Sequence, residues 1–169
     1  MGFFIMKFLE KDLEQIIHES GMDLLNQRGL PIEGKMFRQM KIGNFGIADL
    51  MTIERPFREK IPDYGMITHP GKITIYELKK EKISIGAFLQ SIKYAKGVLA
   101  YLQKIDKRHL FEIKIVLIGK TIDVSGSFCF IPDVISSSDC EIKFYTYKYN
   151  IDGLSFYEQH GYSLINEGF

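Results

Sequence analysis

The sequence predicts an α/β domain in which helices pack on one mixed β-sheet. Three observations lead to this fold class. The chain has 169 residues, of which 46% are hydrophobic, a length usual for one domain and sufficient for a sizeable core. Apolar residues recur at helical spacing in two stretches, and shorter strand-like runs surround them. The order along the chain is α-β-β-β-α-β, followed by further strands.

The first predicted helix covers residues 8–26. Its apolar residues recur about one turn apart and form a single stripe: Leu9, Leu13, Ile16, Ile17 and Leu24. Gly21 stands inside this segment, and a glycine weakens a helix at that point. We therefore expect the helix to end or bend at Gly21.

Three strands are predicted next, at residues 35–42, 46–54 and 72–80. Gly43 and Asn44 form a turn signal between the first two. Residues 55–71 combine prolines, glycines and charges of both signs, a composition typical of a long loop or of a hairpin tip. The chain between the second and third strands is therefore expected to leave the body of the sheet.

The second predicted helix runs from about residue 84 to residue 105. Its apolar stripe consists of Ile85, Leu89, Ile92, Leu99 and Leu102. A strand at 111–119 follows, and then a short strand within 127–135 that Pro132 ends. The segments 141–150 and 154–164 alternate apolar and polar residues around Asp152-Gly153, which is a strong β-hairpin signal.

Charged residues stand on strand faces that are otherwise apolar. Side chains at i and i+2 of a strand point to the same side, so Glu77 and Lys79 share a face with Ile75. By the same spacing, Asp49 shares a face with Met51. Burying an unpaired charge is costly, so a salt bridge or a metal must compensate these groups. The alternative is a strand end, where Glu77 and Lys79 are simply solvated.

The segments "GIADLM", "ITIYELKK" and "QSIKY" resemble motifs of the PD-(D/E)XK nuclease superfamily, most closely its RecB-like and NucS-like branch. The resemblance covers roughly residues 8–105. It implies a restriction-endonuclease-like mixed sheet flanked by helices, with extra C-terminal strands. Residues 1–169 would form a single domain, with a core at about 8–120 and a strand-rich extension at 121–169. Ala48 departs from the family pattern, which has a proline before the aspartate.

The resemblance implies a catalytic set built around two carboxylates. Asp49, Glu77 and the carbonyl of Leu78 would hold Mg²⁺ or Mn²⁺, which prefer oxygen ligands. Lys79 would orient the attacking water and offset phosphate charge. On the first helix, Glu10 would hold a water of the metal or a second metal, and Glu14, one turn later, is the alternative.

The same resemblance assigns residues around this set. Gln90 and Tyr94 lie one helical turn apart and would form a phosphate- or base-contacting edge, with a solvent-facing aromatic surface as the alternative. Arg38 would contact a phosphate. Lys80 and Lys82 would steer a nucleic-acid backbone or form a solvated strand end.

The sequence thus predicts a Mg-dependent endodeoxyribonuclease, with DNA as partner, RNA not excluded and a homodimer left open. Residues 1–110 carry 18 Lys/Arg against 13 Asp/Glu, which suits a polyanion but also fits ordinary surface variation. Two alternatives stay open: an inactive nuclease-fold module that binds nucleic acid or a protein, and a structural subunit with a salt-bridge cluster. No segment has the roughly 18 apolar residues of a membrane span, and no secretory signal is evident, so a cytoplasmic protein is expected.

Overall fold

A six-stranded mixed sheet forms the centre of the molecule. The computed structural model describes residues 10–123 and 140–160. The strands lie in the order β1 (Lys35–Lys41), β2 (Ile47–Glu54), β5 (Gly71–Leu78), β7 (Phe111–Gly119), β9 (Cys140–Asn150) and β10 (Gly153–Gln159). β5, β7 and β9 run parallel, and the pairs β1–β2, β2–β5 and β9–β10 are antiparallel. The predicted mixed sheet is confirmed, and the last two strands extend it.

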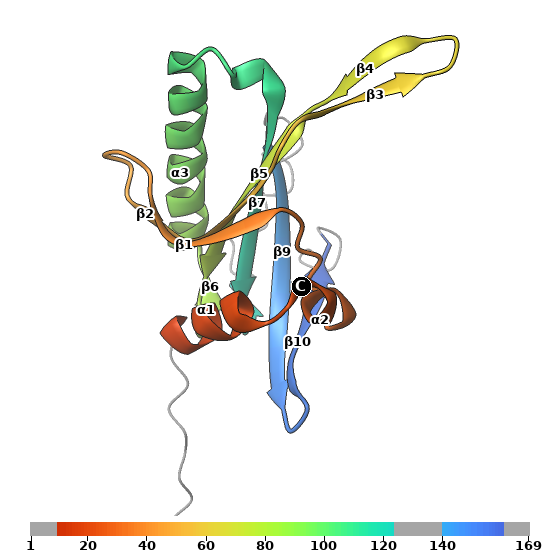
Figure 1. Ribbon diagram of the computed structural model, residues 1–169. Coiled ribbons are helices and arrows are strands. Elements are labelled where there is room, and N and C mark those ends of the chain that lie inside the picture. The colour runs from red at the N-terminus through yellow and green to blue at the C-terminus, as the bar shows by residue number, and fades with distance from the viewer. Residues whose placement is uncertain (1–9, 124–139, 161–169) are drawn as a thin grey trace, which may run out of the picture.

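Helices cover both faces of the sheet, as Figure 1 shows. The helix α3 (Ile85–Lys104) connects the parallel strands β5 and β7 and lies on one face. The shorter helices α1 (Glu10–Glu19) and α2 (Met22–Gln27) lie on the opposite face. Ser84 begins α3 as its N-cap, with the side-chain oxygen accepting a hydrogen bond from the backbone N of Ala87. The predicted class, a sheet flanked by helices, is therefore confirmed.

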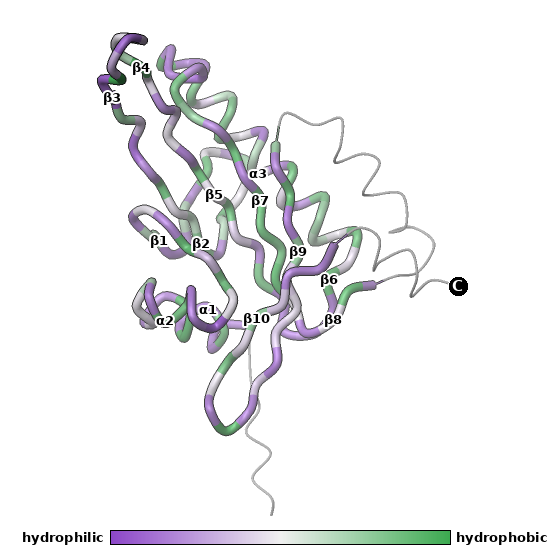
Figure 2. The backbone as a smooth tube through the Cα atoms, turned by 90° about the vertical axis from the view of Figure 1, so that its right-hand side faces the viewer, coloured by the Kyte–Doolittle hydropathy of each residue, from purple (hydrophilic) through white to green (hydrophobic). Residues whose placement is uncertain are grey.

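Each sheet face has its own hydrophobic core. The core under α3 includes Ile73 and Ile75 of β5, and the core under α1 and α2 includes Tyr76 and Leu78 of the same strand. Alternate residues of β5 thus enter opposite cores, as the strand period requires. Figure 2 shows a hydrophobic run in β7, and residues 115–119, its second half, are all buried, as expected of a parallel strand covered on both faces.

The first helical segment divides at Gly21, as expected. Gly21 has extended backbone angles, φ −66° and ψ 151°, and serves as the N-cap of α2. The segment 55–71 forms a hairpin, β3 (Phe57–Ile61) and β4 (Gly65–His69). Of the two forms predicted for it, a long loop or a hairpin tip, the hairpin is therefore confirmed. The predicted hairpin around Asp152-Gly153 is also confirmed, as β9 and β10.

The predicted apolar stripe of α3 was only partly right. Leu102 is buried, but Leu89 is 59% exposed and Tyr94 only 4%. The helix face that meets the sheet includes small residues, among them Gly97, where an added Cβ would lie 2.7 Å from Ile42. Large aliphatic residues alone therefore did not mark the buried face, because close approach to the sheet requires small side chains.

Three short elements have no counterpart in the sequence prediction. β6 (Lys82–Ile83) and β8 (Thr121–Ile122) form a parallel two-residue pair, and a 3₁₀ turn covers Arg108–Leu110. The strand expected within 127–135 lies outside the described residues. Among the helices that are described, none has the length and apolarity that would let it cross a membrane.

Candidate active site

The candidate site lies where the β2–β5 ladder ends. Leu50 pairs with Tyr76 at this end of the ladder, and Asp49 and Glu77 are the next residues of the two strands. There, Oδ2 of Asp49 accepts a 2.8 Å hydrogen bond from the backbone N of Leu78. A side chain thus satisfies a backbone donor at the point where pairing between the two strands stops. The two predicted carboxylates are therefore neighbours.

Glu77 is buried beside Lys79, which follows the last residue of β5. Only 2% of the Glu77 side chain is exposed, and its Oε1 lies 2.9 Å from Nζ of Lys79. Its second oxygen, Oε2, is buried and has no hydrogen-bond partner among the described residues. The Lys79 side chain is 25% exposed, so the pair lies at the edge of the core and reaches solvent. A buried oxygen without a partner is rare in proteins and marks a position that a ligand can occupy.

The charges of the site are strongly coupled. Burial, and then the charge of Asp49, raise the pKa of Glu77 to about 7, against the opposing effect of Lys79. Burial also raises the pKa of Asp49, although the Leu78 N–H and the Lys79 charge act against the rise. For Lys79, burial lowers the pKa, but the hydrogen bond to Glu77 and the surrounding carboxylate charges outweigh burial and raise it. Additional positive charge at this point would relieve both carboxylates.

The donor set fits a partly hydrated divalent cation. In residues 10–123 and 140–160, no three His, Cys, Asp or Glu side chains are grouped so that they could hold a metal ion. Mg²⁺ usually keeps several waters and binds one or two carboxylates together with substrate phosphates. Asp49 and Glu77 provide two carboxylates. The carbonyl of Leu78 is on the same side of β5 as its N–H, which faces Asp49.

The two candidate acidic residues of α1, Glu10 and Glu14, have different environments. Glu10 is exposed, and its Oε1 accepts a 3.4 Å hydrogen bond from the backbone N of Lys80. Its charge raises the pKa of Asp49, Glu77 and Lys79. Glu10 therefore lies within electrostatic reach of all three groups, and its contact with Lys80 uses only one of its two carboxylate oxygens.

Glu14, by contrast, is buried and fully engaged. Its Oε1 accepts a 2.7 Å hydrogen bond from Nε of Arg38, and its Oε2 accepts one of 2.5 Å from Nε2 of Gln39. The Arg38 side chain, predicted to contact a phosphate, is 32% exposed and forms an ion pair with Glu14. Gln39 was not among the predicted site residues, because nothing in its residue type or position indicates a hydrogen bond to a residue 25 positions away.

Gln90 and Tyr94 bind each other instead of the carboxylates. Nε2 of Gln90 donates a 2.5 Å hydrogen bond to the Tyr94 hydroxyl, and within the described residues neither side chain bonds to Asp49, Glu77 or Lys79. Tyr94 lies in the core under α3, so the alternative of a solvent-facing aromatic surface is wrong for this residue. Its ring contacts Gly46, next to the start of β2, where an added Cβ would lie 2.6 Å from Cε1.

The predicted lysines lie just beyond β5. The Lys80 backbone is held on both sides, because its N–H donates to Glu10 and its carbonyl accepts a hydrogen bond from the hydroxyl of Tyr147. Lys82 is exposed on β6. Tyr147 of β9 was not among the predicted site residues, and its contact with Lys80, 67 residues earlier, has no signal in the sequence.

Comparisons with known proteins add little to this geometry. No protein-family model and no curated protein matches the chain. Among solved structures, an EndoMS–dsDNA2 complex matches with a TM-score of 0.44 and 16% sequence identity, over 85% of this chain and 48% of that one. The chain thus spans about half the length of that protein. A match at this TM-score and identity does not indicate the function of this chain.

Proposed function

We propose that this chain is a metal-dependent nuclease that hydrolyses phosphodiester bonds of DNA, with Mg²⁺ or Mn²⁺ at Asp49 and Glu77. The observation that supports this most is the proximity of these two carboxylates beyond the Leu50–Tyr76 end of the β2–β5 ladder, with a buried Glu77 oxygen that has no hydrogen-bond partner in the described part of the chain. Their order along the chain, with Lys79 two residues after Glu77, also resembles the PD-(D/E)XK nucleases.

Phosphodiester hydrolysis requires a nucleophilic water, stabilisation of phosphate charge and protonation of the leaving oxygen. A divalent cation held by Asp49, Glu77 and the Leu78 carbonyl would supply Lewis-acid stabilisation and activate water. Because the carboxylates keep Lys79 charged, its amine acts as a hydrogen-bond donor to water or phosphate and not as a base. Glu10 would hold a water of the metal, or a second metal, through its second carboxylate oxygen.

The second candidate is an inactive module with the same fold that binds nucleic acid or a protein. The ion pair of Lys79 with Glu77 favours it, because one carboxylate oxygen is already occupied by an ammonium group. Buried ion pairs of this kind also occur as purely structural features. The two candidates differ in one respect that can be measured directly, which is cleavage that depends on a divalent cation.

The test incubates the chain with labelled single-stranded, duplex and flap DNA and with RNA, each with Mg²⁺, Mn²⁺ or EDTA. Asp49→Asn and Lys79→Ala should lower cleavage by at least about 100-fold, since each removes charge stabilisation from the reaction. Glu112→Gln is the matched control, because Glu112 is an exposed carboxylate elsewhere on the sheet. Cleavage that persists in both site variants would exclude this active site, and absence of metal-dependent cleavage on every substrate would favour the inactive module.

A further inference from the structure

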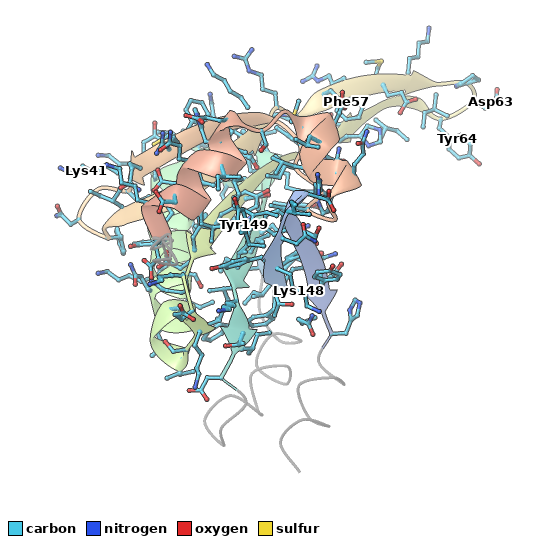
Figure 3. All side chains as sticks on the ribbon, turned by 90° about the horizontal axis from the view of Figure 1, so that it is seen from below. Lys41, Phe57, Asp63, Tyr64, Lys148 and Tyr149 are labelled. Atoms are coloured by element: carbon cyan, nitrogen blue, oxygen red, sulfur yellow. The ribbon has the colours of Figure 1, made fainter. Side chains whose placement is uncertain are left out.

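The β3–β4 hairpin extends away from the rest of the molecule. Figure 1 shows it projecting beyond the sheet, and Figure 3 shows Asp63 and Tyr64 at its far end, with Phe57 nearer the body. Eight of its ten strand residues are exposed, on both faces of the hairpin. A two-stranded hairpin without a covering layer is marginally stable in water. The hairpin therefore belongs to neither hydrophobic core of the domain.

The hairpin continues the strand pair that carries the candidate site. Glu54 opposes Lys72 at the end of the β2–β5 ladder, and Phe57 opposes His69 at the start of the β3–β4 ladder. The register is the same in both ladders, so the two form one ribbon interrupted only near Pro56 and Pro70. Asp49 and Glu77 therefore lie at one end of this ribbon, and the hairpin tip lies at the other.

The two faces of the hairpin differ in charge. Residues directly opposite each other in an antiparallel pair share a face. Arg58 opposes Thr68 and Lys60 opposes Met66, so this face carries two cations and no carboxylate. The carboxylate of Glu59 is on the other face, where its Oε2 lies 3.0 Å from Nε2 of His69. One face is thus complementary to a polyanion.

The dimensions of the hairpin fit the same partner. A two-stranded ribbon is of a size that the major groove of B-DNA, about 12 Å wide, admits. Nine residues separate Asp49 from Arg58 along the ribbon, which corresponds to roughly 30 Å at about 3.3 Å per residue. One turn of B-DNA spans a similar length, about 34 Å. Nine is an odd number of residues, so Arg58 and Asp49 are on opposite faces of a flat ribbon. The right-handed twist of a two-stranded ribbon must therefore turn the cationic face toward a duplex that passes the carboxylates, and such a duplex would meet the hairpin about one turn away from them.

We propose that the β3–β4 hairpin is a duplex-DNA-binding arm, with Arg58 and Lys60 contacting phosphates about one helical turn from the bond at Asp49 and Glu77. The identity of the partner rests on the proposed nuclease function. The arm makes duplex DNA the preferred substrate class, because a single strand has no groove to receive the ribbon. Tyr64, 81% exposed, is the outermost aromatic contact.

The test measures DNA binding by fluorescence anisotropy in EDTA, where binding is separate from cleavage. It compares the full chain with Arg58→Gln/Lys60→Gln on a duplex of roughly two turns and on the labelled single strand alone. The matched control is Lys93→Gln/Lys96→Gln, which removes the same charge from exposed positions on α3. Circular dichroism verifies that every variant is folded, and sedimentation gives its oligomeric state.

We expect the hairpin variant to bind the duplex about tenfold or more weakly, with a smaller change on the single strand. The slope of log K against log salt should fall by about 1.8, or about 0.9 for each lost phosphate contact. Unchanged duplex affinity, or an equal loss in the control, would overturn the arm. So would a dimer that the hairpin variant dissociates without loss of duplex affinity, which would make the hairpin a self-association surface.

The outcome is independent of the test for cleavage. If duplex binding depends on Arg58 and Lys60 but no substrate is cleaved with Mg²⁺, the proposed nuclease function is refuted and the proposed arm is not. If the chain cleaves DNA but the hairpin variant binds duplex as tightly as the wild type, the proposed arm is refuted and the proposed nuclease function is not. A chain that binds no duplex under any salt condition would refute the arm.

Discussion

Asp49 and Leu78 face each other across the open end of the β2–β5 ladder, joined by a hydrogen bond of 2.8 Å from the Leu78 N–H to Oδ2 of Asp49. Asp49 therefore has a structural partner as well as its place beside Glu77. Removing its side chain leaves the Leu78 N–H, in a partly buried position, without its acceptor. The structural and the chemical contributions of Asp49 can be separated by the choice of substitution.

Asp49→Ala should lower the free energy of unfolding by about 1–3 kcal/mol, the cost of leaving a buried donor without its acceptor. Asp49→Asn should cost less, because the amide oxygen still accepts from Leu78 and burial disfavours the charged carboxylate. Urea denaturation in EDTA measures both values. Equal losses in the two variants would contradict a structural role for this hydrogen bond.

Divalent cations should stabilise the folded chain through Asp49 and Glu77. A ligand at about 100 times its dissociation constant adds about 2.7 kcal/mol, which raises the Tm of a chain of this size by about 5–10 °C. The increase with Mg²⁺ or Mn²⁺ should disappear in Asp49→Asn and persist in Glu112→Gln. A Tm that rises equally in Asp49→Asn would place the cation elsewhere.

Without a metal, Glu77 should make stability depend on pH. Its folded-state pKa of about 7 is above the ordinary value of 4.5, so its contribution is fully present below pH 4.5 and is lost as pH rises through 7. Glu77→Gln mimics the protonated acid and does not titrate. Its free energy of unfolding, relative to that of the wild type, should therefore rise by up to about 3 kcal/mol between pH 5 and pH 8. Urea denaturation in EDTA at both pH values gives the difference, and a constant difference would refute this assignment.

Gly46→Ala should destabilise the chain by about 2–4 kcal/mol. Gly46 has φ +125°, which an alanine rarely adopts, and its Cβ would lie 2.6 Å from the Tyr94 ring. Gly43→Ala is the control, since Gly43 also has a positive φ of 49° but no atom within 4 Å of an added Cβ. Gly43→Ala should cost about 1 kcal/mol. Thermal unfolding compares the combined cost of the +125° backbone and the Tyr94 contact at Gly46 with the milder backbone strain at Gly43, and equal losses in the two variants would contradict this prediction.

Arg38 was predicted to contact a phosphate, whereas the structure pairs it with Glu14. Arg38→Gln should therefore lower the free energy of unfolding by about 1–3 kcal/mol, because it leaves the buried Glu14 carboxylate with one fewer cation. Glu14→Gln combined with Arg38→Gln should recover part of that loss in a double-mutant cycle. If Arg38 contacts DNA directly instead, the salt slope of binding will fall by about 0.9 with no comparable loss of stability.

Local patterns were sufficient where a feature depends on nearby residues. The break at Gly21, the Asp152-Gly153 hairpin and the helix from Ile85 follow from backbone preferences within a few residues. The buried face of α3 did not follow in the same way. Leu89 is exposed and Tyr94 is buried. Which side of the helix is buried depends on where the sheet lies, and the helix sequence alone does not contain that information.

By itself, the sequence determined the order of elements, the mixed sheet and the presence of Asp49, Glu77 and Lys79 on strand segments. Only the tertiary structure decided that Asp49 accepts a hydrogen bond from the Leu78 N–H, that Glu14 is held by Arg38 and Gln39, and that Tyr147 reaches Lys80. The reason is physical. Strand and helix periodicity are properties of adjacent residues, whereas these contacts join segments from 24 to 67 residues apart, and their geometry depends on how the whole sheet is assembled.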